Sequence, residues 1–246
     1  MTSNTEKDDL KRLSEFFNKD PEAFSIFEEE IDVEIQKEFY TSMENITQKL
    51  EDSENKSLEN TDKLYDKNVS IEEKKETLLL LSNLNEVEAY RAIEKFIKKG
   101  DKQLKKWALI AFQQSRMMIE SSLMSEKSIY ISTGLGGKDS KLRYFCVFFT
   151  RKQTSLNKKE KDILKKEIEF AFRDGNAEIE TMDYTNGIVT FKALIPLATN
   201  IKDMFDSIIK EINNYGNILN KNMIITNVKS LTIDEIEHLL QQKSEE

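Results

Sequence analysis

The sequence predicts an α+β protein in which an all-helical N-terminal part packs on a C-terminal antiparallel sheet. Apolar residues recur every three to four positions through the first half, whereas strands alternate with helices in the second. The 246 residues include only two Pro and seven Gly, which fits long helices and short connections. We divide the chain into an acidic helical segment with a polar linker (1–66), a helical layer (67–126) and an α+β domain (127–246).

The N-terminal segment is expected to form two helices. The first lies around residues 8–18. The second begins at Asp20-Pro21, a cap followed by a residue favoured at the first helical position, and continues to Leu50 with one apolar side. That side needs a partner surface: the rest of the chain, a second copy through the 21–50 helix, or another protein. Residues 51–69 lack an apolar stripe and indicate a linker or loop.

Three more helices are expected between Ser70 and Met124. Ser70 and Glu73 have the spacing of a capping box, and the run Leu78–Leu81 predicts a helix buried on more than one side. The segment 86–124 contains GDKQLKKWALIAF, which resembles the second half of a HEAT-like helical repeat. The resemblance covers one hairpin and implies its shape only.

The C-terminal domain shows a β-α-β-β-α-β order. Asn186-Gly187 between two strand patterns is a strong hairpin signal. The expected strands and helices, in order, are 142–149, 157–173, 177–184, 188–195, 200–213 and 223–228, with a final helix capped by Thr232. This order resembles the ferredoxin-like fold, a split βαβ, over about residues 140–230. That fold serves RNA binders, ligand sensors, metal carriers and enzymes, so it implies no single function.

Aromatic residues mark both faces of the first strand of this domain. Alternation places Tyr144 and Phe148 on one face and Phe145 and Phe149 on the other. One face must meet the two helices of the domain. The other could face RNA, solvent or the N-terminal helices, and we expect the N-terminal helices to cover it. The glycine-aromatic signature of RNA-recognition domains is absent from the sequence.

A glycine-rich loop, 132–139, follows a short strand pattern at 129–131. It is interpreted either as a hairpin loop or as an anion nest, in which backbone amides and a lysine hold a phosphate or carboxylate. Its spacing matches neither the dinucleotide fingerprint nor the P-loop. The three central arginines are added as candidates, with ion pairs to nearby Glu as the alternative. The anion-binding candidates are Thr133, Gly134, Gly136, Gly137, Lys138, Arg143, Arg116 and Arg91.

The composition offers little support for catalysis. A single Cys and a single His exclude a disulfide within the chain and disfavour Cys-His or Ser-His relays. We therefore expect no metal, no cofactor and no catalytic residues. Without an N-terminal apolar run or a stretch long enough to span a membrane, a cytoplasmic location is expected.

The charges are unevenly distributed and suggest an interaction protein. Residues 1–66 hold 19 acidic and 8 basic side chains, whereas 89–175 hold 10 acidic and 20 basic. The favoured hypothesis is a non-catalytic adaptor whose basic middle docks an anionic or acidic protein partner and whose acidic N-terminal helix mediates a second contact. The alternatives are an RNA- or ribosome-associated factor, and a phosphate-ligand enzyme or sensor that uses the 132–139 loop.

Overall fold

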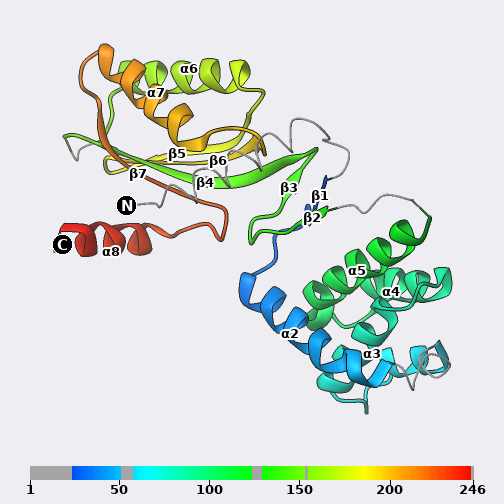
Figure 1. Ribbon diagram of the computed structural model, residues 1–246. Helices are drawn as coiled ribbons and strands as arrows, with labels where there is room; N and C mark the ends of the chain where they lie inside the picture. Colours follow the sequence, from blue (N-terminus) through cyan, green and yellow to red (C-terminus); the bar gives the residue numbers. More distant parts are fainter. Residues whose placement is uncertain (1–23, 51–57, 124–128, 153–154, 245–246) are drawn as a thin grey trace. The chain divides into compact units, whose positions relative to one another are not determined.

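The structure is a computed structural model that describes residues 24–50, 58–123, 129–152 and 155–244 (Figure 1). The helix expected around 8–18 and its neighbour's expected start at Asp20-Pro21 lie outside these residues. None of the described helices has the length and apolar character needed to cross a bilayer.

The chain divides into two compact units. Unit 1 comprises Met1–Glu30 and Ile131–Glu246, and unit 2 comprises Ile31–Tyr130. Unit 1 is therefore discontinuous in sequence, because the helical unit is inserted between a short N-terminal segment and the sheet domain. The three-part division expected from composition had placed residues 1–30 with the helices.

Unit 2 is a helical layer. Its described elements are α2 (Val33–Leu50), η3 (Leu58–Leu64), α3 (Ile71–Ser82), α4 (Val87–Lys99), η4 (Lys102–Leu104) and α5 (Lys105–Leu123). The capping box predicted at the start of α3 is present, with Ser70 accepting from the Glu73 amide and Glu73 accepting from the Ser70 amide. Trp107 is buried on α5, and its indole donates to the Lys75 carbonyl at 3.2 Å.

The N-terminal helix is shorter than the sequence pattern suggested. Phe24–Ile26 forms a strand, β1, and α2 begins only at Val33, so the expectation of a helix from 21 to 50 is wrong over 24–32. The apolar side of α2 packs within unit 2, where the centroids of the Phe39 and Trp107 rings lie 5.1 Å apart. A homodimer through this helix stays a prediction. The expected linker also contains η3, whose Leu64 is buried.

Unit 1 contains the predicted antiparallel sheet. Its elements are β3 (Gly137–Lys138), β4 (Lys141–Thr150), α6 (Lys158–Asp174), β5 (Glu178–Thr185), β6 (Ile188–Pro196), α7 (Ile201–Asn214), β7 (Leu219–Thr226) and α8 (Ile233–Ser244). The long strands follow the order β7-β4-β6-β5, all antiparallel. This order, with both crossover helices on one face, is the split βαβ arrangement that the sequence predicted (Figure 1).

The two faces of the sheet have different covers. Cys146, Phe148 and Phe191 join the residues of α6 and α7 in one core. Phe145, Val147 and Phe149 on the opposite face pack with Ile236 of α8, which lies across the sheet from α6 and α7 (Figure 1). The expectation that the N-terminal helices cover this second face is therefore corrected, since the C-terminal helix α8 lies there.

The glycine-rich loop does not join a hairpin. The strand before it, β2 (Ile129–Ile131), pairs with β1, and the Phe27 amide donates to the Ile131 carbonyl at 2.9 Å. The hairpin is formed by β3 and β4 instead, through Asp139 and Ser140, whose φ angles are 47° and 61°. At the second turn the sequence was right, since Asn186 and Gly187 have φ of 44° and 82° between β5 and β6.

Candidate functional site

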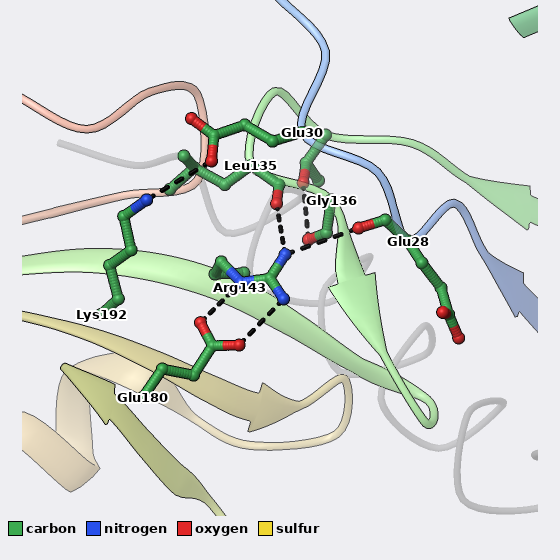
Figure 2. Close-up of polar contacts among 8 residues, drawn as sticks. Glu28, Glu30, Leu135, Gly136, Arg143, Glu180 and Lys192 are labelled. Carbon is green, nitrogen blue, oxygen red and sulfur yellow. Dashed lines mark hydrogen bonds and ion pairs between the residues drawn. The ribbon is translucent and has the colours of Figure 1, made fainter. Parts of the chain in front are cut away.

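Arg143, one of the predicted anion ligands, is held inside unit 1 (Figure 2). Its Nε and one terminal nitrogen donate to the two carboxylate oxygens of Glu180 at 2.6 and 2.9 Å. The other terminal nitrogen donates to the Leu135 carbonyl at 2.8 Å. Hydrogen bonding to Glu180 raises the pKa of Arg143 above its ordinary value. The guanidinium thus joins β4 to β5 and to the glycine-rich loop.

The glycine-rich loop is buried against the chain that follows β1. The Leu135 amide donates to the Asn227 carbonyl at 3.0 Å, and the Gly136 amide to the Thr133 carbonyl at 3.2 Å. A Cβ on Gly136 would lie 2.4 Å from the Glu28 carbonyl oxygen, so a glycine is required there. These two amides therefore donate to protein oxygens. Anion binding by the loop stays a prediction.

Of the remaining predicted ligands, Gly134 lies within this loop, and the others lie at its edge or apart from it. Gly134 is buried in the loop, and Gly137 begins β3. Lys138 is exposed, with its Nζ 3.9 Å from the Asp139 carboxylate. Arg91 and Arg116 belong to unit 2, where they pair with Glu94 at 2.9 Å and Glu120 at 2.7 Å. The ion pairs to nearby Glu that the sequence suggested are thus present for Arg91 and Arg116, whereas Arg143 pairs with the distant Glu180.

Side chains of the kinds that bind metals do not gather in the part of the chain described. No group of three or more His, Cys, Asp or Glu residues lies close enough to hold a metal ion among those residues. Cys146 is buried on β4, and burial raises the pKa of its thiol. His238 is exposed on α8.

Basic side chains converge at another place in unit 1. A groove of about 520 Å³ lies along the C-terminal half of α7 and the start of β7, and we call it the α7–β7 groove. Its lining residues are Arg151, Asp206, Ile209, Lys210, Asn213, Asn214, Asn217 and Lys221. Three of these are cations and three are amides.

The sequence builds this groove by fixing the loop between α7 and β7. The Asn213 side chain donates to the Leu219 carbonyl at 3.0 Å and accepts from the Leu219 amide at 2.8 Å. Asn217 tolerates its φ of 53°, which bends the chain back toward the strand. Arg151 is anchored from the other side, because its Nε donates to the same Leu219 carbonyl at 3.0 Å. The backbone of Leu219 thus holds both Asn213 and Arg151 in place.

The charge of the groove is not neutralised by neighbouring acids. Arg151, Lys210 and Lys221 are exposed, and none lies within 4.0 Å of a carboxylate in the part of the chain described. The single acid of the lining, Asp206, forms an ion pair with Lys202 instead. The groove is therefore a concave surface with three available cations.

A second basic surface lies in unit 2, at the turn from α4 to α5. We call it the lysine turn: Lys98, Lys99, Lys102, Lys105 and Lys106. Lys98 pairs with Glu94 at 2.9 Å, whereas the other four have no ion pair within the described residues.

The α7–β7 groove was not predicted from the sequence. Arg151, Lys210 and Lys221 are separated by 58 and 10 positions and show no motif. The one signal in the sequence is the run of Asn residues around Tyr215-Gly216.

Comparisons with known proteins identify no family. No known protein family and no curated protein matches the sequence. Several solved structures are similar, and two of them are as follows. A REP-associated tyrosine transposase bound to a REP hairpin is 16% identical over 41% of this chain and 63% of its own, with a TM-score of 0.32. A protein of Deinococcus radiodurans R1, assigned as a transposase, is 14% identical over 44% of this chain and 92% of its own, with a TM-score of 0.34.

These matches correct the favoured functional hypothesis. Both similar chains are named as transposases and neither is named as an adaptor, so the non-catalytic adaptor hypothesis is not kept. At TM-scores of 0.32 and 0.34 the likeness is too distant to transfer an activity to this chain. The function of this protein must therefore be argued from its own surfaces.

Proposed function

We propose that the protein binds nucleic acid through the sugar-phosphate backbone, at the α7–β7 groove. The observation that carries this proposal is the convergence of Arg151, Lys210 and Lys221, none of them paired with an acid in the described structure, on one concave surface.

Phosphate groups fit the chemistry of the groove. With its Nε bonded to the Leu219 carbonyl, Arg151 keeps its two terminal nitrogens for a planar pair of acceptor oxygens. Lys210 and Lys221 add point charges from α7 and β7. Asn214 and Asn217 supply amides, which donate to sugar and phosphate oxygens in protein–DNA contacts.

The exposure of these cations favours a polyanion over a small ligand. An exposed ion pair contributes roughly 0.2–1 kcal/mol, so a single phosphate gains little from one lysine. A nucleic acid meets several cations at once and releases a condensed counterion at each contact. Residues 1–66, with 19 acidic and 8 basic side chains, account for the net charge of −8 of the chain.

The test compares two variants with equal loss of charge. A fluorescent DNA hairpin with a single-stranded tail offers both forms of nucleic acid, and its anisotropy reports binding to the full-length protein. Lys210→Ala/Lys221→Ala removes two cations from the groove and should weaken binding about tenfold. Lys105→Ala/Lys106→Ala removes two from the lysine turn and should leave affinity within about twofold of wild type.

Two results would overturn the proposal. One is an absence of binding by the wild-type protein at low salt. The other is the reverse pattern, in which the lysine-turn variant loses affinity and the groove variant does not, because the contact would then lie on unit 2.

A further inference from the structure

Two large aromatic side chains are exposed on the helical side of unit 1, one on α6 and one at the end of α7. Phe170 of α6 is 65% exposed and Tyr215, directly after α7, is 60% exposed. A single exposed aromatic residue is common on protein surfaces and carries no meaning alone. The residues that surround these two rings suggest that the rings bind a ligand.

The rings lie on adjoining parts of α6 and α7. The Tyr215 hydroxyl interacts with the carboxylate of Glu167, which raises the pKa of Tyr215. Glu167 is three residues before Phe170, so the two occupy neighbouring positions on α6. Tyr215 also follows Asn213 and Asn214, which line the α7–β7 groove. Tyr215 therefore borders the proposed phosphate site, and Phe170 lies beyond it on α6.

Two more available cations flank Phe170. Lys166 and Arg173 lie four residues before it and three residues after it, on the same exposed helix face. Neither has an ion pair among the residues that the structure describes, whereas neighbouring Glu169 is taken by Lys165 at 3.7 Å. The face of α6 thus presents an aromatic ring with Lys166 and Arg173 beside it, and with the acids Glu167 and Asp174 at the other neighbouring positions.

We propose that Phe170 and Tyr215 stack on unpaired bases, so that the nucleic acid recognised is single-stranded at this surface. The inference rests on the proposed function and narrows its substrate class. Aromatic rings beside cations bind single strands because each base presents a π-face while the backbone follows the charges. In a duplex these faces are hidden, and exposed rings would meet only sugar and phosphate.

The experiment separates base contacts from backbone contacts with three DNA probes of about 12 nucleotides: a single strand, an abasic strand of equal length and a blunt duplex. Wild-type protein should bind the single strand about tenfold more tightly than the abasic strand. The variant Phe170→Leu/Tyr215→Leu should lose about tenfold on the single strand and nothing on the abasic strand.

Tyr40→Leu is the matched control, since Tyr40 is a 42% exposed aromatic residue of unit 2, outside both proposed contacts. It should bind all three probes like wild type. Thermal unfolding of each variant verifies that the exposed substitutions leave the fold intact.

The inference is overturned if the duplex is bound as tightly as the single strand, or if the double variant loses affinity equally on the abasic strand. These outcomes leave backbone binding at the groove in place. If none of the probes binds, the proposed function fails together with the inference, so the two failures are distinguishable.

Discussion

Gly136 illustrates how a glycine-rich sequence acts at the scale of single residues. Its φ of +66° and its contact with the chain after β1 both require a residue without Cβ. The sequence therefore indicated correctly that this loop depends on glycine. It did not show whether the glycine admits a ligand or a neighbouring backbone, because the carbonyls of Glu28 and Glu29 lie more than 100 positions away.

Gly136→Ala should destabilise unit 1 by about 3 kcal/mol, because strain at positive φ adds to a clash with the Glu28 and Glu29 carbonyl oxygens at 2.4 and 2.6 Å. Gly216→Ala is the control: its φ is +152°, but nothing lies within 4 Å of the new Cβ. It should cost only about 1 kcal/mol. Urea unfolding followed by circular dichroism measures both, and equal losses would show that the close approach is unimportant.

Ser115 is a position at which a substitution should stabilise the protein. Its hydroxyl is buried on α5 and has no hydrogen-bond partner in the described part of the chain. Ser115→Ala should therefore stabilise unit 2 by about 1 kcal/mol, since it removes an unsatisfied polar group and raises helix propensity.

Ser82→Ala is its control, because the buried Ser82 hydroxyl donates to the Leu79 carbonyl at 2.7 Å and no gain is expected there. Trp107, the only Trp, is buried in unit 2 and reports its unfolding by fluorescence. A loss of stability in Ser115→Ala would mean that the hydroxyl has a partner after all.

At the scale of elements, features set by neighbouring residues were predicted correctly, whereas the pairing of β1 with β2 was not. The capping box at Ser70 and the Asn186-Gly187 turn are set by neighbouring residues and were identified. β1 was mistaken for helix because Phe24, Phe27 and Ile31 also have helical spacing. Its strand form depends on pairing with β2, over 100 residues away, and no local pattern encodes that pairing.

Among these elements, α8 has a start that should depend on pH. Thr232 and Glu235 form a reciprocal cap, and Glu235 also pairs with Lys229. The Lys229 ammonium, then the Thr232 amide, lower the pKa of Glu235 from 4.5 to about 2. A lowered pKa means that the ionised form stabilises the folded helix. This contribution is complete above pH 4.5 and is lost as pH falls toward 2.

Hydrogen exchange of the α8 amides measures this effect. Wild type should be better protected than Glu235→Gln above pH 5 or so, and the difference should vanish near pH 2 or so. Glu237→Gln, two residues further along and outside the cap, is the control. A difference between wild type and Glu235→Gln that is the same at every pH would contradict the assigned role of the carboxylate.

At the scale of the whole molecule, the distribution of charge along the sequence suggested one basic middle region that docks a partner. The basic region found by counting, 89–175, spans both units. What the structure adds is local: the three cations of the α7–β7 groove, brought together by the folding of α7 and β7 onto the loop after β4. Net charge could not reveal this groove.

The dependence of nucleic-acid affinity on salt tests the central claim most directly. If three phosphates are neutralised at the α7–β7 groove, log K for a single strand should fall against log salt with a slope of about −2. In Lys210→Ala/Lys221→Ala the slope should shrink to about −0.7, because one contact is left. A slope that is the same in wild type and variant, or an affinity that does not change with salt, would contradict binding of the nucleic-acid backbone at this groove.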